Sequence, residues 1–202
     1  MIAFRTYVKG DVAAFYRTSD AFGAFSNMHG DFPLEVAGLT VPSTEAFYQA
    51  MRFPHLPDFQ REILEQETPI LSKRHAYTRL EESRSDWLDG ANIAIMRHAL
   101  AIRCGGHPER MRALFEASAG RSIVEISKRD NFWGTFKEGD ILRGRNVLGR
   151  LWMERRQLHL DLSNDEAREI AAPSYPEALL CGIQIEAFTS RPAKNTQSVM
   201  SL

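Results

Sequence analysis

The stretch D-W-L-D-G-A-N-I-A-I-M-R-H-A-L-A-I-R (residues 86–103) decides the expected fold class of this chain. Its apolar residues recur at spacings of three and four, the pattern of a helix with one apolar face. They are Trp87, Ile93, Ile95, Met96, Ala99, Leu100 and Ile102. We therefore expect a helix over residues 86–103, which Cys104-Gly105-Gly106 should end.

Further helices are expected on both sides of this stretch. Ser43 or Thr44 should cap a helix over residues 44–53. This helix should end by Phe53, because Pro54 disfavours helical geometry in the residue before it. Other helices are expected over residues 58–66, from Pro69 through Lys73, and from Pro108 to Gly120. Asn146 should cap a last long helix, whose inward residues are Val147, Leu148, Leu151, Trp152 and Leu158.

Strands should be short and few. One is expected near the start of the chain, one over residues 34–36 and one over residues 122–126, whereas the glycine-rich residues 130–145 are expected to form a loop. A helix over residues 164–171 and a strand over 182–188 should follow. The expected fold is mainly α with a few short β-strands, in a single compact domain over residues 1–162. Residues 163–202 would form a C-terminal extension whose last dozen or so residues are flexible.

The composition is that of a soluble globular protein. The 202 residues are 44% hydrophobic and 25% charged, and the net charge of −1 argues against a protein that coats nucleic acid. No signal peptide and no membrane span is expected, and the two cysteines, Cys104 and Cys181, fit a reducing cytoplasm. The six histidines form no zinc motif, so we expect neither a metal nor a cofactor. The oligomeric state stays open.

The first candidate site lies on the helix over residues 44–53. Glu45, Gln49 and Arg52 are spaced i, i+4 and i+7, so they share one face, with Tyr48 beside them. The rest of this helix is apolar, which is typical of a buried helix whose polar strip meets a cavity. The alternative is an acidic first turn that interacts with the helix dipole, above an exposed polar strip.

The second candidate site is the segment S-K-R-D-N-F-W-G (residues 127–134). It directly follows an expected strand, where functional loops are common. The spacing lets Asp130 and Trp133 face one space, and Gly134 would let the backbone approach a ligand. The alternative is an Asx turn with Trp133 buried in the core.

The third candidate is the start of the helix after Asn146, which could bind an anion through its free amides. The alternative is an ordinary capped helix. Twenty of the 25 basic residues are arginines, which favours capture of phosphate or carboxylate but also fits a simple composition bias.

Taken in order, these segments resemble the NADAR family, also called YbiA-like. The resemblance runs from about Phe25 to His159. It includes F-S-N (residues 25–27), T-E-A-F-Y-Q-A, the Ser72-Lys73 helix, Trp87, the Ile95-Met96 helix, I-V-E-I-S-K-R-D-N-F-W-G and G-R-N-V-L-G-R-L-W-M-E-R-R. It implies a mainly helical fold and hydrolysis of N-glycosidic bonds without a metal, with phosphorylated ribosylamino-pyrimidines as one substrate class.

On this resemblance, Glu45 would activate water and Asp130 would stabilise the sugar cation or protonate the leaving group, although the two roles could be exchanged. The expected substrate-binding residues are Asn27, Tyr48, Gln49, Arg52, Lys73, Trp87, Trp133, Gly134 and the amides near Asn146. The partner would be a small phosphorylated ribosyl substrate or nucleotide.

Three positions depart from the family pattern. Ala46 stands where a histidine is frequent, and Arg52 and Arg103 stand where lysines are common. Arginine keeps the positive charge but cannot donate a proton at neutral pH. These departures leave two alternatives: release of ADP-ribose from guanine or nucleic acid, and a non-catalytic module that binds nucleotide or ADP-ribose. A purely structural protein is a third.

Overall fold

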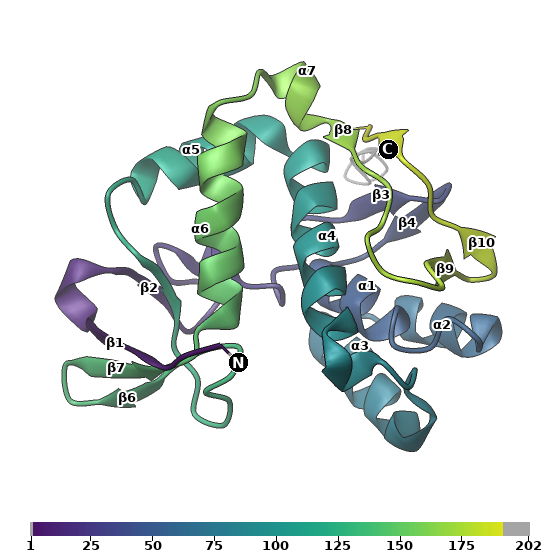
Figure 1. The fold of residues 1–202 in the computed structure, drawn as a ribbon, viewed down its shortest axis with the longest axis horizontal. Coiled ribbons are helices and arrows are strands. Elements are labelled where there is room, and N and C mark those ends of the chain that lie inside the picture. The colour runs from purple at the N-terminus through teal and green to yellow at the C-terminus, as the bar shows by residue number, and fades with distance from the viewer. Residues whose placement is uncertain (1, 192–202) are drawn as a thin grey trace, which may run out of the picture.

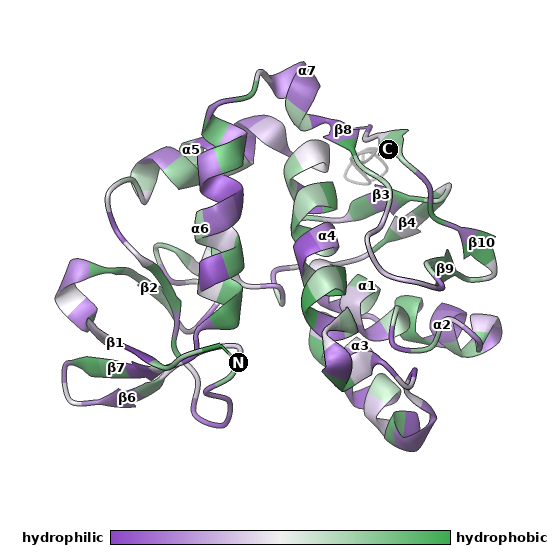
Figure 2. Cartoon of the chain, viewed as in Figure 1, coloured by the Kyte–Doolittle hydropathy of each residue, from purple (hydrophilic) through white to green (hydrophobic). Residues whose placement is uncertain are grey.

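Two helices stand side by side at the centre of the structure, a computed structural model that describes residues 2–191. α4 (Ala91–Gly106) packs against α6 (Val147–Leu160), as Figure 1 shows. Buried side chains of both, such as Met96 and Trp152, belong to one apolar core. Figure 2 shows hydrophobic and hydrophilic stretches alternating along α6, whose buried residues include Leu148 and Leu151. The mainly helical fold class is confirmed.

The central helix starts and ends later than its sequence predicts. Gly90 takes a φ of +114°, which favours glycine, and separates α4 from a short 3-10 helix (Trp87–Asp89). At the other end, α4 continues through both glycines. A Cβ at Gly105 would come within 2.8 Å of the Ile170 side chain, so Gly105 allows close packing and does not end the helix.

The remaining helices flank this central pair. α1 (Thr44–Ala50), α2 (Pro57–Leu64) and α3 (Pro69–Ala76) form one cluster beside α4, and α5 (Pro108–Ala117) packs against α6. Ser43 caps α1 by accepting a hydrogen bond from the Ala46 amide, so it fills one of the two expected cap positions. Leu158, expected to face inward, is instead half exposed on α6.

The strands are short and scattered over several small sheets. They are β1 (Arg5–Val8), β2 (Ala13–Phe15), β3 (Leu34–Val36), β4 (Leu39–Val41), β5 (Ile123–Glu125), β6 (Phe136–Glu138), β7 (Ile141–Gly144), β8 (Glu169–Ile170), β9 (Leu179–Leu180), β10 (Ile183–Gln184) and β11 (Phe188–Thr189). β2 and β5 pair in parallel, and the sheet β1-β7-β6 is antiparallel.

The segment expected to be a loop, residues 130–145, contains a hairpin. Gly139 turns the chain with a φ of +60°, and β6 and β7 pair on either side of it. β7 also pairs with β1, more than 130 residues earlier in the chain, so much of its stabilisation is invisible in the local sequence.

Residues 163–191 pack onto the same core as the rest of the chain. α7 (Asn164–Ala167) ends earlier than expected, and β10 is shorter than the strand expected over residues 182–188. Buried side chains here include Ile170, Tyr175 and Leu180. The flexibility expected for the last dozen residues concerns residues outside the described part, apart from Arg191. No helix within residues 2–191 is long and apolar enough to cross a membrane.

Candidate active site

A cavity of about 690 Å³ lies where α1, α3, the start of α4 and the loop after β5 meet. All but two of the expected site residues line it: Asn27, Glu45, Tyr48, Gln49, Arg52, Lys73, Trp87, Asp130 and Trp133. The two acids expected to act together, Glu45 and Asp130, therefore line one cavity although 85 positions separate them in the sequence.

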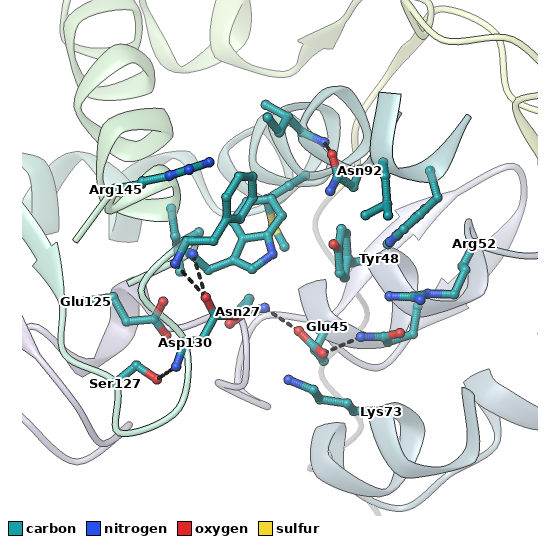
Figure 3. A pocket seen from close by; sticks show the side chains of 18 of the residues that line it. Asn27, Glu45, Tyr48, Arg52, Lys73, Asn92, Glu125, Ser127, Asp130 and Arg145 are labelled. Carbon is teal, nitrogen blue, oxygen red and sulfur yellow. Dashed lines mark hydrogen bonds between the residues drawn. The ribbon is translucent and has the colours of Figure 1, made fainter. Parts of the chain in front are cut away.

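Glu45 is held in a fixed orientation in the first turn of α1. Its carboxylate accepts hydrogen bonds from the Asn27 side chain and from Gln49 Nε2, the latter at 2.8 Å (Figure 3). The Glu45 amide also donates to the Asn27 carbonyl at 3.1 Å. Burial raises the pKa of Glu45, and the positive charges of Lys73 and Arg52 oppose this rise. The polar strip on α1 thus meets a cavity and not open solvent.

Side chains of α4 and α6 hold the loop that supplies Asn27 in place. The carbonyls of Ala24 and Ser26 accept hydrogen bonds from the Arg103 guanidinium, and the Phe25 carbonyl accepts one from Trp152 Nε1 at 2.7 Å. Arg103 is fully buried with its guanidinium 3.8 Å from the Phe32 ring centroid. Its burial lowers its pKa to about 9, which leaves the group charged at neutral pH.

Two departures from the family pattern therefore lie outside the cavity. Arg103 supports the Asn27 loop from the core, and Ala46 is fully buried among apolar side chains. Arg52 is the departure that does line the cavity.

Asp130 both forms an Asx turn and lines the cavity, so it combines the two interpretations of residues 127–134. Its Oδ1 accepts hydrogen bonds from the amides of Phe132 and Trp133, at 2.8 and 2.9 Å, which is an Asx turn. Its own amide donates to Ser127 Oγ at 3.1 Å. The turn leaves Oδ2 available, and the side chain lines the cavity. The Trp133 ring, only partly buried, stands edge-on to Tyr48 at a centroid distance of 5.6 Å.

A third acid, Glu125, was missed by the sequence reasoning. It ends β5 and lines the cavity beside Asp130, as Figure 3 shows. Its carboxyl is withdrawn from water, and this burial, with the negative charges of Asp130 and Glu45, raises its pKa to about 8. The stretch I-V-E-I contained the signal, since a lone acid among β-branched residues is unusual for a buried strand.

Gly134 lies outside the cavity lining and packs against Glu125. A Cβ at this position would come within 3.0 Å of the Glu125 carbonyl and 3.3 Å of its carboxyl. Glycine at this position therefore allows close packing behind Glu125.

Asn146 also lies outside the lining, and the expected anion site at the start of α6 is not open. The amides of Asn146, Val147 and Leu148 donate to carbonyls of the segment 132–134, at 3.0–3.1 Å. The Asn146 side chain makes no cap; it donates to the Ile123 carbonyl at 2.9 Å and accepts from the Glu125 amide at 3.2 Å. Asn146 thus ties β5 to α6 behind the site.

Positive charge enters the cavity from side chains. The Arg52 guanidinium lies 4.2 Å from the Trp87 ring centroid, and Trp87 packs against Tyr48 at 4.9 Å. Arg52 and Lys73 both approach the ring of Tyr77, at 5.7 and 5.6 Å. Two cations beside three flat rings suit an anionic ligand that carries an aromatic base. Among residues 2–191, no group of His, Cys, Asp and Glu has the arrangement of a metal site.

Comparison with known proteins agrees with this geometry. The profile of the NADAR domain matches residues 14–159, and the chain belongs to this family. N-glycosidase YbiA of Escherichia coli strain K12 is 35% identical over 143 residues, which cover 71% of this chain and 85% of that protein. The chloroplastic riboflavin biosynthesis protein PYRR of Zea mays is 33% identical over 165 residues, covering 72% of this chain and 25% of that protein.

A solved structure shows the same fold. The NMR structure of the E. coli protein YbiA superposes with a TM-score of 0.63 and 34% identity, covering 73% of this chain and 83% of the other. The fold class and the family expected from the sequence are both confirmed, and the names of these relatives support a glycosidase-like hydrolase.

Proposed function

We propose that this protein hydrolyses the N-glycosidic bond of a phosphorylated ribosylamino-pyrimidine or a related nucleotide. The observation that carries the proposal is the meeting of Glu45 and Asp130 in one cavity beside the indole of Trp133. The names of its relatives, N-glycosidase and riboflavin biosynthesis protein, support the same chemistry.

Cleavage of a ribosyl C–N bond leaves positive charge on the sugar and negative charge on the departing base. Glu45, held as a hydrogen-bond acceptor by Asn27 and Gln49, is oriented to take a proton from the attacking water. The free oxygen of Asp130 would stabilise the sugar cation. The water oxygen then bonds to the anomeric carbon while the bond to the base nitrogen breaks.

The leaving nitrogen needs a proton, and Glu125 is suited to supply it. A carboxyl with a pKa of about 8 is protonated at neutral pH, which is the state that a general acid requires. This assignment leaves Asp130 with the single role of stabilising the sugar cation. Glu45 gains one proton and Glu125 loses one, so the two exchange protons with solvent before the next turnover.

The remaining lining residues would bind the substrate. Arg52 and Lys73 would hold the phosphate, and Tyr48, Trp87 and Trp133 would contact the base or the sugar ring. Gln49 donates a hydrogen bond from its amide nitrogen to Glu45. Its buried Oε1 has no hydrogen-bond partner within residues 2–191 and could accept a hydrogen bond from a substrate group after a small side-chain shift.

The test is to incubate the protein with ribosylamino-pyrimidine phosphate and, separately, with ADP-ribosylated guanosine, and to measure the released sugar. Release of ribose 5-phosphate from the first supports the proposal. Release of ADP-ribose alone would assign the protein to the alternative reaction. Binding of both compounds with no release would make it a non-catalytic module.

A further inference from the structure

The first turn of α4 forms part of the cavity wall and carries no side-chain cap. Gly90, Asn92 and Ile93 line the cavity at the start of this 16-residue helix. The Ile93 amide donates to the Gly90 carbonyl and to Asn92 Oδ1, at 3.1 and 2.7 Å. Within residues 2–191, the Asn92 amide has no hydrogen-bond acceptor. The positive end of the α4 dipole therefore faces the cavity.

The Asn92 side chain adds a second donor to this turn. It is only 7% exposed, and its Oδ1 is engaged by the Ile93 amide, which fixes the orientation of the side-chain amide. The other atom, Nδ2, donates to no acceptor in the described part of the chain and is not sealed from the cavity. Figure 3 shows this nitrogen on the side of Asn92 that faces Tyr48. A largely buried donor without an acceptor costs free energy, so it indicates a ligand atom that accepts.

Tyr48 supplies a third donor, from α1. Its side chain is buried, and its hydroxyl has no hydrogen-bond partner among residues 2–191 while remaining open to the cavity. Burial, with the negative charge of Glu45, raises the pKa of Tyr48 above its ordinary value of 10. The hydroxyl therefore keeps its proton at neutral pH and is available as a donor.

These donors lie at the rings that the proposed function assigns to the base or the sugar. Tyr48 packs against Trp87 and Trp133, at centroid distances of 4.9 and 5.6 Å. Asn92 follows Trp87 by five positions, and in Figure 3 Tyr48 lies between Asn92 and Glu45. A substrate whose anomeric carbon lies beside Glu45 would therefore direct an edge of its base at Asn92 and the Tyr48 hydroxyl.

An oxygen on that edge would gain charge during the reaction. When the C–N bond breaks, its electron pair passes to the departing nitrogen and, in a conjugated base, spreads to a carbonyl oxygen of the ring. A developing oxyanion binds the same donors more strongly than the neutral carbonyl does. Donors that are already aimed at such an oxygen therefore lower the barrier. An amino group at the same position would instead place donor against donor.

We propose that Asn92 and Tyr48, with the free amide at the start of α4, form an oxyanion site for the leaving base. The site selects bases that carry a carbonyl oxygen at this position over bases that carry an amino group. The inference rests on the proposed function. Glu125 still gives the leaving nitrogen its proton, and the α4 site stabilises the charge that has spread to the oxygen. Asn92 is thereby a catalytic residue in addition to the three acids.

The test exchanges the Asn92 donor for an acceptor of the same size. Asn92→Asp keeps the oxygen that the Ile93 amide needs, and an acid suits a helix N-terminus, so the fold should be preserved. Turnover is measured with two ribosylamino-pyrimidine phosphates that differ only in the replacement of one carbonyl oxygen by an amino group. The variant should lower kcat for the carbonyl substrate by about 10²–10³-fold. The loss should be much smaller for the amino substrate, because the new carboxylate accepts from its amino group.

A second variant removes only the hydroxyl donor. Tyr48→Phe keeps the packing of the ring against Trp87 and Trp133, so it should lower kcat for the carbonyl substrate more than for the amino substrate. Equal losses for the two substrates in both variants would overturn the oxyanion site and leave the proposed function intact. Hydrolysis of the amino substrate alone by the wild type would overturn it as well.

If neither substrate is hydrolysed, the proposed function fails and binding becomes the readout. Calorimetry then compares uridine 5′-monophosphate with cytidine 5′-monophosphate, which differ by a carbonyl oxygen and an amino group at one ring position. Tighter binding of the uridine nucleotide by the wild type, with the preference reversed in Asn92→Asp, would support the donor site. The same ratio of the two dissociation constants in both proteins, or binding of neither nucleotide, would overturn it.

Discussion

Glu125 is the side chain whose surroundings change its chemistry most. Its raised pKa of about 8 means that the folded protein keeps a proton on this carboxyl through neutral pH. If that proton goes to the leaving base, activity should fall as pH rises through about 8. Glu125→Gln should lower kcat by about 10²–10⁴-fold, because an amide cannot donate the proton. A pH–rate profile of both proteins checks this, and an unchanged alkaline limb in the variant would contradict the assignment.

The same carboxyl makes stability depend on pH. Between the unfolded pKa near 4.5 and the folded value near 8, the native state holds a proton that the unfolded state has lost. Stability should therefore decrease with rising pH in this window, at no more than about 1.36 kcal/mol per pH unit from this group. Denaturant unfolding at several pH values measures the slope, which Glu125→Gln should reduce.

Asp130 can be tested for its two roles separately. Asn at this position keeps an oxygen to accept from the Phe132 and Trp133 amides, so Asp130→Asn should preserve the turn while removing the charge. We expect about a 10²–10³-fold loss of turnover, with thermal stability near that of the wild type. Asp130→Ala should lose both the turn and the activity. Near-normal turnover in Asp130→Asn would mean that the residue only shapes the loop.

At the residue scale, the sequence predicted the site residues that lie close together along one helix. It did not predict the roles of residues whose partners lie far away in the sequence. The i, i+4, i+7 spacing placed Glu45, Gln49 and Arg52 on one helix face, and all three line the cavity. Gly134 and Asn146 were assigned to ligand binding, yet they pack behind the site, because their partners come from β5. No local pattern discloses that contact.

At the scale of elements, the loop carrying Asn27 depends on α4. Arg103 supplies two hydrogen bonds to this loop and stacks on Phe32. In Arg103→Lys, a single ammonium group cannot reproduce the planar fork of the guanidinium. We expect a loss of about 1–3 kcal/mol in the free energy of unfolding. Chemical denaturation measures it, and a variant as stable as the wild type would contradict this role.

The C-terminal segment contacts the residues next to Trp87 through the Pro176 carbonyl. The buried Arg84 side chain binds Asp86 through two hydrogen bonds and the Pro176 carbonyl at 2.8 Å, directly before the cavity residue Trp87. Its amide donates to the Arg52 carbonyl at 2.9 Å. Arg84→Lys should therefore raise KM several-fold by loosening Trp87, with a smaller effect on kcat. Steady-state kinetics of the wild type and of Arg84→Lys measure the effect, and an unchanged KM would refute it.

At the scale of the whole molecule, the core is larger than the family domain. The NADAR match ends at residue 159, yet buried residues continue to Ser190. For example, the buried Gln60 side chain donates hydrogen bonds to the Ala50 and Leu179 carbonyls and accepts one from the Cys181 amide. A chain ending at residue 162 should therefore unfold at a much lower temperature than the full chain, which calorimetry can measure. Equal melting temperatures would show that residues 163–191 are dispensable for folding.

The extent of this core could not be read from the sequence. Residues 163–202 show a change of composition that favoured a separate extension. Their short strands gain stability from partners far along the chain, such as Gln60 and α4. The helices were better predicted, because their apolar spacing and caps are local. The two central helices followed from the patterns at residues 86–103 and after Asn146, with errors confined to their ends.

The central claim is that Glu45 acts on an anomeric carbon held in the cavity. The most direct measurement is the single-turnover release of ribose 5-phosphate from bound ribosylamino-pyrimidine phosphate by the wild type and by Glu45→Gln, with substrate binding determined for both. We predict a rate about 10²–10⁴-fold lower in the variant, with binding retained to within a few-fold. A variant that binds the substrate and releases sugar at nearly the wild-type rate would contradict the account.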